Sequence, residues 1–185
     1  MVLIVTGIAP LISKTEYIND KILRLHILAN SDENYDQELK LKVRDYILLK
    51  TKDIYTDSEN LDDALNKTKE HINDFEKYTS DVIKENGYNY TVKVTVDKEY
   101  YNTRNYDDFY MPAGVYNSLK IVIGEGNGHN WWCVMYPTVC ISGCVDDFDD
   151  ELTPEEKEFL VSKKFVPKFK IVEVYEKIKY KITNW

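Results

Sequence analysis

The stretch from residue 21 to residue 50 constrains the fold of this chain more than any other feature, because its hydrophobic period changes part of the way along. The first apolar positions alternate, at Leu23, Leu25, Ile27 and Ala29. This period of two predicts a strand with one apolar row toward a core. Asn30, Ser31 and Asp32 then favour a turn and a helix N-cap. We therefore predict a strand, a tight turn and a helix, in that order.

The predicted helix has two different faces. Its core face is formed by Leu39, Val43, Tyr46 and Ile47. The opposite face, with Leu41, Leu48, Gln37, Lys40 and Arg44, is either a second packing surface or a docking surface for another protein. We hypothesise that Gln37, Lys40 and Arg44 contact a partner, with Arg44 as anchor because a guanidinium can fork onto a carboxylate. The alternative pairs Arg44 internally with Asp32 or Asp36.

The middle of the chain predicts one long helix followed by two strands. Helical spacing runs from Leu61 to Ile83, and Asn86-Gly87 follows as a C-cap. Alternation from Tyr90 to Val96 predicts a strand, a polar loop spans residues 100–110, and residues 115–123 predict the next strand. The expected fold is α+β, a small antiparallel sheet with helices on one face. Its order is β-α-α-β-β, then a loop-rich segment and C-terminal helices.

A glycine-rich segment with two tryptophans follows these strands. Gly124, Gly126 and Gly128 lack a following lysine, so we expect them to form a tight turn rather than a phosphate site. Adjacent residues in extended backbone point to opposite sides. We therefore predict that one of Trp131 and Trp132 is buried and that the other is presented to a partner.

The three cysteines lie close together in the sequence, at Cys133, Cys140 and Cys144. We predict a disulfide between Cys133 and Cys140, with three free or buried thiols and a zinc site including His129 as alternatives. The only catalytic arrangement to consider is a Cys133 nucleophile with His129 or His26, and buried thiols are usually inert. The sequence thus predicts no catalytic residues, no metal site and no cofactor.

The two ends of the chain differ in character. Residues 1–20 begin with an apolar run and are interpreted as a truncated export or anchor segment, or else as an ordinary buried element; residues 21–185 are predicted to form a single α+β domain. An acidic block extends from Asp146 to Glu158, and within it Thr153-Pro154 is predicted to open a short helix as N-cap and first helical residue. A lysine-rich amphipathic helix follows, and its basic face is either solvated or in contact with an anionic membrane surface. The net charge of −8 argues against nucleic acid as a partner.

Several runs together resemble the stage II sporulation protein R family of endospore-forming bacteria. They are LRLHILANSD, DQELKLKVRD, PAG, IVIGEG and NWWC with a second cysteine at Cys140. The resemblance extends from Ile22 to Cys140, with a weaker similarity in FKIVEVYEKI near the C-terminus.

The resemblance implies a function that residue patterns do not give. Members of this family are made in the forespore and exported into the space between the two membranes around it. There they activate a membrane-embedded aspartic protease of the mother cell, which processes an inactive sigma factor. We therefore expect a non-catalytic, secreted signalling protein of unknown oligomeric state. The alternative is a secreted hydrolase of cell-wall or peptide substrates.

Overall fold

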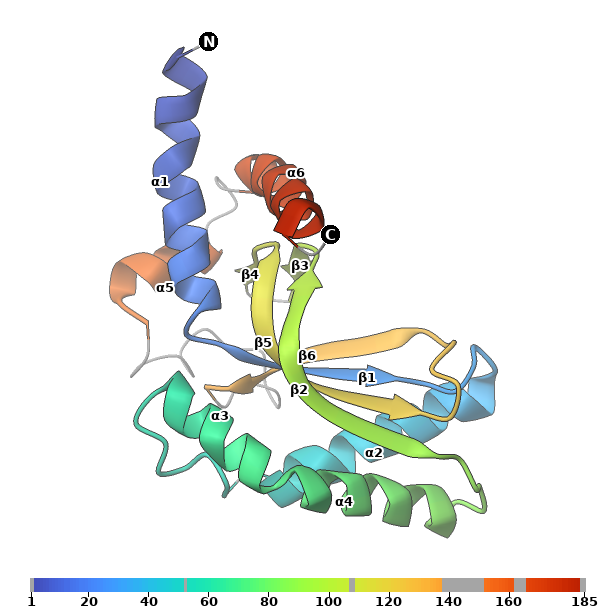
Figure 1. The fold of residues 1–185 in the computed structure, drawn as a ribbon. Helices are drawn as coiled ribbons and strands as arrows, with labels where there is room; N and C mark the ends of the chain where they lie inside the picture. The colour runs from blue at the N-terminus through green and yellow to red at the C-terminus, as the bar shows by residue number, and fades with distance from the viewer. Residues whose placement is uncertain (1, 52, 107–108, 138–151, 162–165, 184–185) are drawn as a thin grey trace. The chain divides into compact units, whose positions relative to one another are not determined.

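The computed structural model describes residues 2–51, 53–106, 109–137, 152–161 and 166–183 (Figure 1). In chain order the elements are α1 (Val2–Asn19), β1 (Leu23–Leu28), α2 (Asn34–Thr51), α3 (Leu61–Glu70), α4 (Ile72–Glu85), β2 (Val92–Tyr101), β3 (Arg104–Asn105), β4 (Tyr110–Met111), β5 (Gly114–Ile123), β6 (Asn130–Tyr136), α5 (Pro154–Val161) and α6 (Val166–Thr183). The α+β class predicted from the sequence is confirmed.

The chain divides into two compact units. The sheet unit comprises Leu23–Asp97 and Ser118–Ile141. The helical unit comprises Met1–Ile22, Lys98–Asn117 and Ser142–Trp185.

The sheet unit contains a four-stranded sheet in the order β2-β5-β1-β6. β1 and β6 are antiparallel, with Leu25 opposite Cys133. The amide of Gly124 donates to the carbonyl of Thr91 at 2.8 Å, so the end of β5 meets the start of β2 and these strands are antiparallel. That same end of β5 lies beside Asn30, just beyond the end of β1, so β1 and β5 run in parallel. The sheet is mixed, and the prediction of a purely antiparallel sheet was wrong.

The sheet is mixed because of the order of its strands, and not because a strand runs in an unexpected direction. The helices between β1 and β2 do return the chain in the opposite direction, as expected, but β5 occupies the place between them. The segment predicted to be rich in loops also contains a strand, β6, which pairs with the other side of β1. The connection from Gly124 to His129 must therefore cross the end of β1 and the turn that leads into α2.

The helices α2, α3 and α4 lie on one face of this sheet, as predicted (Figure 1). The predicted long helix is instead two helices that meet at His71, whose φ of −95° and ψ of 13° depart from helical geometry. The buried core of the unit comprises Leu23, Leu25, Ile27, Leu39, Val43, Ile47, Tyr55, Leu61, Ala64, Phe75, Val82, Ile83, Leu119, Ile121, Ile123, Cys133, Met135 and Tyr136. The predicted core faces of β1 and α2 are thus both used.

The helical unit contains α1, α5, α6, the small β3–β4 sheet and the adjoining ends of β2 and β5. Part of the predicted polar loop at 100–110 is therefore strand. The helix α5 begins at Pro154 as expected. A capping box also opens it, since the Thr153 amide donates to Glu156 Oε2 at 2.7 Å and the Glu156 amide donates to Thr153 Oγ1 at 3.3 Å. No helix in the described ranges is long and apolar enough to cross a membrane. The first part of the predicted acidic block, residues 146–151, lies outside the described residues, and Glu155, Glu156 and Glu158 lie on α5.

Candidate partner-binding surface

The glycine-rich connection is fixed against the turn between β1 and α2. The amides of Asn127 and Gly128 donate to the carbonyls of Asn30 and Ala29 at 3.1 and 3.0 Å. The Glu125 amide donates to Asn30 Oδ1 at 3.0 Å. A Cβ at Gly128 would lie 2.1 Å from the Ser31 carbonyl oxygen, so this position accepts only glycine without a shift of backbone. The glycines therefore allow close packing of two backbones, which the sequence did not predict.

Asp36, in the first turn of α2, holds the turn from the helix side. Its Oδ2 accepts hydrogen bonds from Asn30 Nδ2 at 2.9 Å and from Ser31 Oγ at 2.6 Å. Burial opposes ionisation of this carboxyl, but the hydrogen bonds from Ser31 and Asn30 outweigh it and lower the pKa of Asp36. An ionised carboxylate at this position also interacts favourably with the N-terminus of the helix. Asp36 thus orients the turn and the first residues of α2 together.

Lys40 connects α2 to the start of β6. Its buried Nζ donates to the His129 carbonyl at 2.8 Å and to Gln37 Oε1 at 2.6 Å, and Gln37 Nε2 donates to the Ser31 carbonyl at 2.8 Å. Burial lowers the pKa of Lys40, and the nearby charge of Asp32 opposes that shift. Two of the predicted partner-binding residues, Gln37 and Lys40, therefore also hold the loop in place.

Arg44 stacks on the ring of Trp131, with its guanidinium carbon 4.3 Å from the ring centroid. Its Nε donates to Asp45 Oδ1 at 2.7 Å, and that carboxylate is exposed. The alternative in which Arg44 pairs with Asp32 or Asp36 was wrong. The Arg44 guanidinium also pairs through Nη2 with Asp45 Oδ1 at 2.6 Å, so a partner carboxylate would compete with the exposed Asp45 for it.

The two tryptophans lie on opposite faces of the sheet, as the alternation predicts. Trp131 is opposite Ile27 and packs against the core, whereas Trp132 is opposite His26, with the two rings 5.4 Å apart. Both side chains are half-buried, so the predicted division into one buried and one exposed tryptophan is not observed. Trp132 lies on the face of the sheet away from α2, and the structure does not bring it to the other four predicted residues.

These residues define the α2–β6 surface, which comprises Gln37, Lys40, Arg44, His129 and Trp131. His129 is its most exposed member, and its amide and Nδ1 contact Asp32 Oδ1 at 2.6 and 2.5 Å. These bonds lower the pKa of Asp32. The contact of His129 with Asp32 beside this surface was not predicted from the sequence. A guanidinium beside an indole suits a partner with carboxylate and aromatic groups, whereas the buried Lys40 holds the loop that carries His129.

A stack of three tyrosines near the start of α2 was also not predicted. The rings of Tyr35 and Tyr88 are 6.1 Å apart, and those of Tyr88 and Tyr90 are 5.4 Å apart. Burial and the neighbouring charge of Asp36 raise the pKa of Tyr90 to about 12. The period-two pattern placed Tyr88 and Tyr90 on one side of a strand, but Tyr35 comes from a distant part of the sequence.

The catalytic arrangement considered from the sequence lacks its thiol. Cys133 is buried and disulfide-bonded, so it has no thiolate to act as a nucleophile. Its predicted partner Cys140 lies outside the described residues, and so does Cys144; the 133–140 pairing stays a prediction. No cluster of three or more His, Cys, Asp or Glu side chains suited to a metal ion occurs among the described residues.

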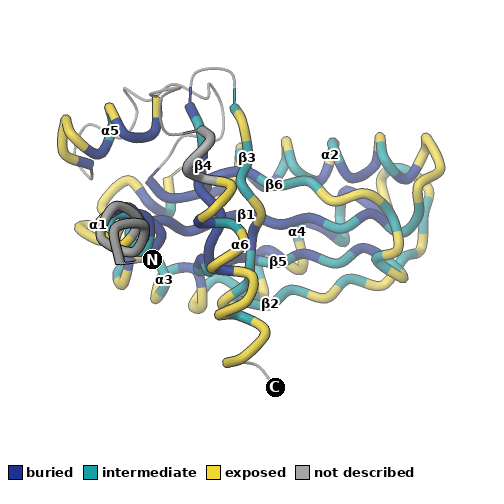
Figure 2. The backbone as a smooth tube through the Cα atoms, turned by 90° about the horizontal axis from the view of Figure 1, so that it is seen from above, coloured by how far each residue is buried: buried dark blue, intermediate teal, exposed yellow. Residues whose placement is uncertain are grey.

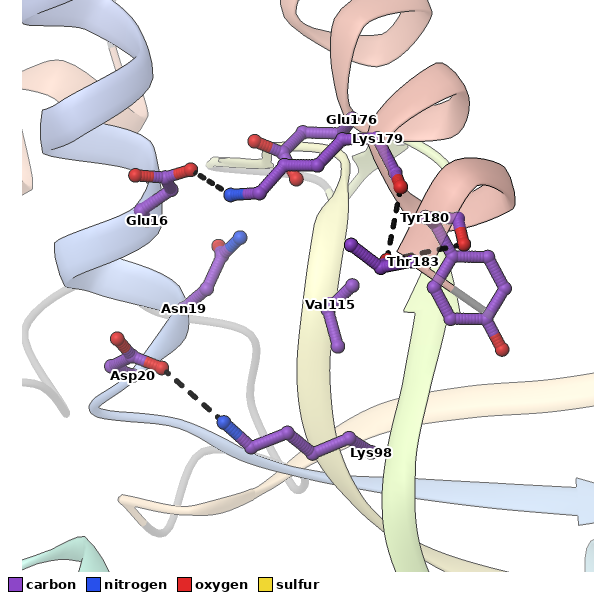
Figure 3. A pocket seen from close by; sticks show the side chains of 9 residues that line it. All are labelled: Glu16, Asn19, Asp20, Lys98, Val115, Glu176, Lys179, Tyr180 and Thr183. Atoms are coloured by element: carbon purple, nitrogen blue, oxygen red, sulfur yellow. Dashed lines mark hydrogen bonds and ion pairs between the residues drawn. The ribbon is translucent and has the colours of Figure 1, made fainter. Parts of the chain in front are cut away.

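The helical unit has a pocket of about 310 Å³, shown in Figure 3. Its lining residues are Glu16, Asn19, Asp20, Lys98, Val115, Glu176, Lys179, Tyr180 and Thr183. Lys179 pairs with Glu16, and Lys98 pairs with Asp20 at 4.0 Å, so its charged walls are largely paired with one another. None of the residues singled out from the sequence as partner-binding lines this pocket. The ion pair between Lys179 and Glu16 in its wall joins α6 to α1.

The fold and the α2–β6 surface define a class of small α+β proteins whose candidate site is a binding surface built on a strand-turn-helix unit. Residues 19–146 match the family model described as Stage II sporulation protein R, and the chain belongs to this family. The chain is also 31% identical over 147 residues to "Stage II sporulation protein R" of Bacillus subtilis (strain 168), covering 80% of this chain and 64% of the relative. No solved structure matches. The resemblance given by the sequence motifs is thereby confirmed.

Proposed function

We propose that this protein is a secreted signalling protein of sporulation that activates a membrane-embedded aspartic protease of the mother cell. The activated protease then processes an inactive mother-cell sigma factor. Membership of the Stage II sporulation protein R family is the observation that carries this proposal. Because the chain spans 64% of the length of its Bacillus relative, the activity and the partner are part of the proposal.

The α2–β6 surface supports a role in which the protein binds rather than catalyses. It places Arg44 against Trp131, and arginine and tryptophan are enriched where binding energy is concentrated. The surface belongs to the family region, since its residues fall within 19–146. We assign the receptor contact to this surface, with Arg44 as the residue that pairs with a receptor carboxylate.

Export from the forespore is the second part of the proposal. A disulfide at Cys133 supports it, because structural disulfides persist in oxidising compartments outside the cytoplasm. The apolar run in α1 suits an export or anchor segment.

Co-expression in a host that does not sporulate tests the proposal. The host would carry this chain with an export signal, the cognate protease and the pro-sigma factor, and immunoblotting would follow the pro-sigma factor. We expect processing that requires both this chain and an intact catalytic aspartate in the protease. Processing that persists with the inactive protease would support the secreted-hydrolase alternative, and processing without this chain would contradict an activating role.

A further inference from the structure

The outer face of α6 carries an apolar stripe that no other described element covers. Of the nine large hydrophobic side chains exposed in the described part of the chain, five lie on this one helix. They are Ile171, Val174, Tyr175, Ile178 and Ile182, which are 42% to 72% exposed. At about 100° per residue these five fall within an arc of about 100°, so they form a continuous stripe along the helix. Figure 2 shows α6 as largely exposed.

The opposite face of α6 is already occupied. Val172 and Glu176 are buried, and Lys179 pairs with Glu16 of α1. The ring of Tyr180 stacks on Tyr100 at 5.7 Å, and the Tyr100 hydroxyl donates to the Glu173 carbonyl at 3.2 Å. The helix is therefore held in a fixed rotation, and the apolar stripe must point away from the helical unit.

A row of lysines lies along one edge of the stripe. Lys170, Lys177 and Lys181 share this row, at spacings of seven and four residues. Lys177 and Lys181 are exposed, and neither forms an ion pair with any residue that the structure describes. The whole helix carries five lysines against two glutamates, in a protein whose net charge is −8. Glu176 belongs to the packed face, and Glu173 pairs with Lys170 at 3.6 Å, so no residue of the apolar stripe itself is acidic.

We propose that the outer face of α6 binds the surface of an anionic phospholipid bilayer. The apolar stripe inserts among the headgroups, and Lys170, Lys177 and Lys181 contact the phosphates. This combination of an exposed apolar face and a lysine edge is that of a helix lying in the membrane interface. A second copy of this chain fits less well, because pairing two stripes would bring the lysine rows together without carboxylates to meet them.

The proposal concerns a surface separate from the α2–β6 surface, and its test does not involve protease activation. Full-length protein would be sedimented with vesicles of equal parts phosphatidylglycerol and phosphatidylcholine, and with vesicles of phosphatidylcholine alone. We expect binding to the anionic vesicles that weakens as salt is raised. The double variants Ile178→Ser/Ile182→Ser and Lys177→Glu/Lys181→Glu should each bind at least about tenfold more weakly. All four side chains are exposed, so circular dichroism should show an unchanged fold.

Matched variants on the sheet unit serve as controls. Vesicle binding by another segment, or pairing of two copies of this chain through α6, would give different results. Leu49→Ser and Lys77→Glu alter an exposed apolar and an exposed basic residue, and should bind like the wild type. Equal binding by the α6 variants would assign vesicle binding to another segment such as α1 and overturn the proposal. Absence of preference for the anionic vesicles would also overturn it. So would a dimer in analytical ultracentrifugation that the Ile178→Ser/Ile182→Ser variant abolishes.

Discussion

Trp131 joins the core of the sheet unit to its surface. One side of the indole packs against the core cluster and the other side carries the Arg44 guanidinium. Its Nε1 is buried and has no hydrogen-bond partner among the described residues. The apolar area of the ring, rather than its N–H group, therefore accounts for its contribution to stability.

Substitution of Trp131 should separate these contributions. We expect Trp131→Ala to lower the free energy of unfolding by about 2 to 3 kcal/mol, less than for a fully buried tryptophan because the side chain is half-buried. Trp131→Phe should retain most of that stability, since it keeps an aromatic ring in the same place. Urea unfolding of both variants measures the effect. If Trp131→Phe were as unstable as Trp131→Ala, the buried N–H group would have to make a contact that this account omits.

Glu176 is a buried carboxyl, and its ionisation should depend on the fold. Burial raises the pKa of Glu176; Lys179 opposes the shift, and the nearby Glu16 carboxyl adds to it. The folded protein therefore holds this proton to higher pH than the unfolded chain does. The free energy of unfolding should fall as pH rises from the ordinary glutamate pKa to the raised pKa of the folded state.

Glu176→Gln removes this ionisation and tests whether it lowers the free energy of unfolding as pH rises. We expect a higher melting temperature than the wild type at pH 7 and no difference at pH 4, where the wild-type carboxyl is protonated. Glu76→Gln, at an exposed position on α4, is the control and should show no such dependence. A Glu176→Gln variant that is less stable than the wild type at pH 7 would mean that attraction to Lys179 outweighs burial.

At the scale of elements, the connection between β5 and β6 determines the candidate site, because it must cross the end of β1. Its path brings His129 onto Asp32 and the Lys40 ammonium. A change that moves this connection away from the turn between β1 and α2 should therefore alter both the stability of the protein and the geometry of the α2–β6 surface.

Gly128→Ala is such a change. The added Cβ would meet the Ser31 carbonyl oxygen at 2.1 Å, and a backbone atom cannot move away as a flexible side chain does. We expect a loss of about 2 to 3 kcal/mol in the free energy of unfolding. Gly87→Ala is the control, since its φ of +82° strains an alanine but leaves its Cβ in open space, with an expected loss of about 1 kcal/mol. Equal losses in the two variants would show that the connection has room to shift.

The local elements of this fold could be predicted from the sequence, but several of their associations could not. Alternation identified β1, and helical spacing identified α2. The break at His71 has no proline or glycine to signal it. β6 has no clear alternation because its residues from Cys133 to Tyr136 are all buried, so it resembled a loop-rich segment.

The same limit applies to the site. Gln37, Lys40 and Arg44 share a helix, and their grouping follows from helical spacing alone. The contact of Trp131 with Arg44, and that of His129 with Asp32, join residues far apart in the sequence. Such contacts depend on the order of strands in the sheet, which local periodicity does not determine.

The disulfide of β6 is also a property of an element and its neighbours. We predict that Cys133 is joined to Cys140 and that Cys144 is free. Closing so short a loop should contribute a few kcal/mol at most. Mass spectrometry of unreduced, alkylated protein should find the 133–140 linkage and a labelled Cys144. A linkage between Cys133 and Cys144, with Cys140 labelled, would refute the pairing.

For the whole molecule, we propose different roles for surfaces on its two units. We assign a protein partner to the α2–β6 surface of the sheet unit and a lipid surface to the α6 stripe of the helical unit. Activation of the protease through the α2–β6 surface is the main proposal. It can be tested without disturbing the fold, because Arg44 contributes little to stability. A cation–π contact at an exposed site is worth about 0.5 to 1 kcal/mol, and its ion pair with exposed Asp45 adds little.

The most direct test is the extent of sigma-factor processing by Arg44→Ala in the co-expression assay, measured beside Lys77→Ala as a control from the exposed surface of α4. Melting temperatures of both purified variants should lie close to that of the wild type. We expect Arg44→Ala to reduce processing at least about tenfold, as loss of an interface anchor does, and Lys77→Ala to leave it unchanged. Normal processing by a correctly folded Arg44→Ala protein would contradict the claim, as would a large fall in its melting temperature.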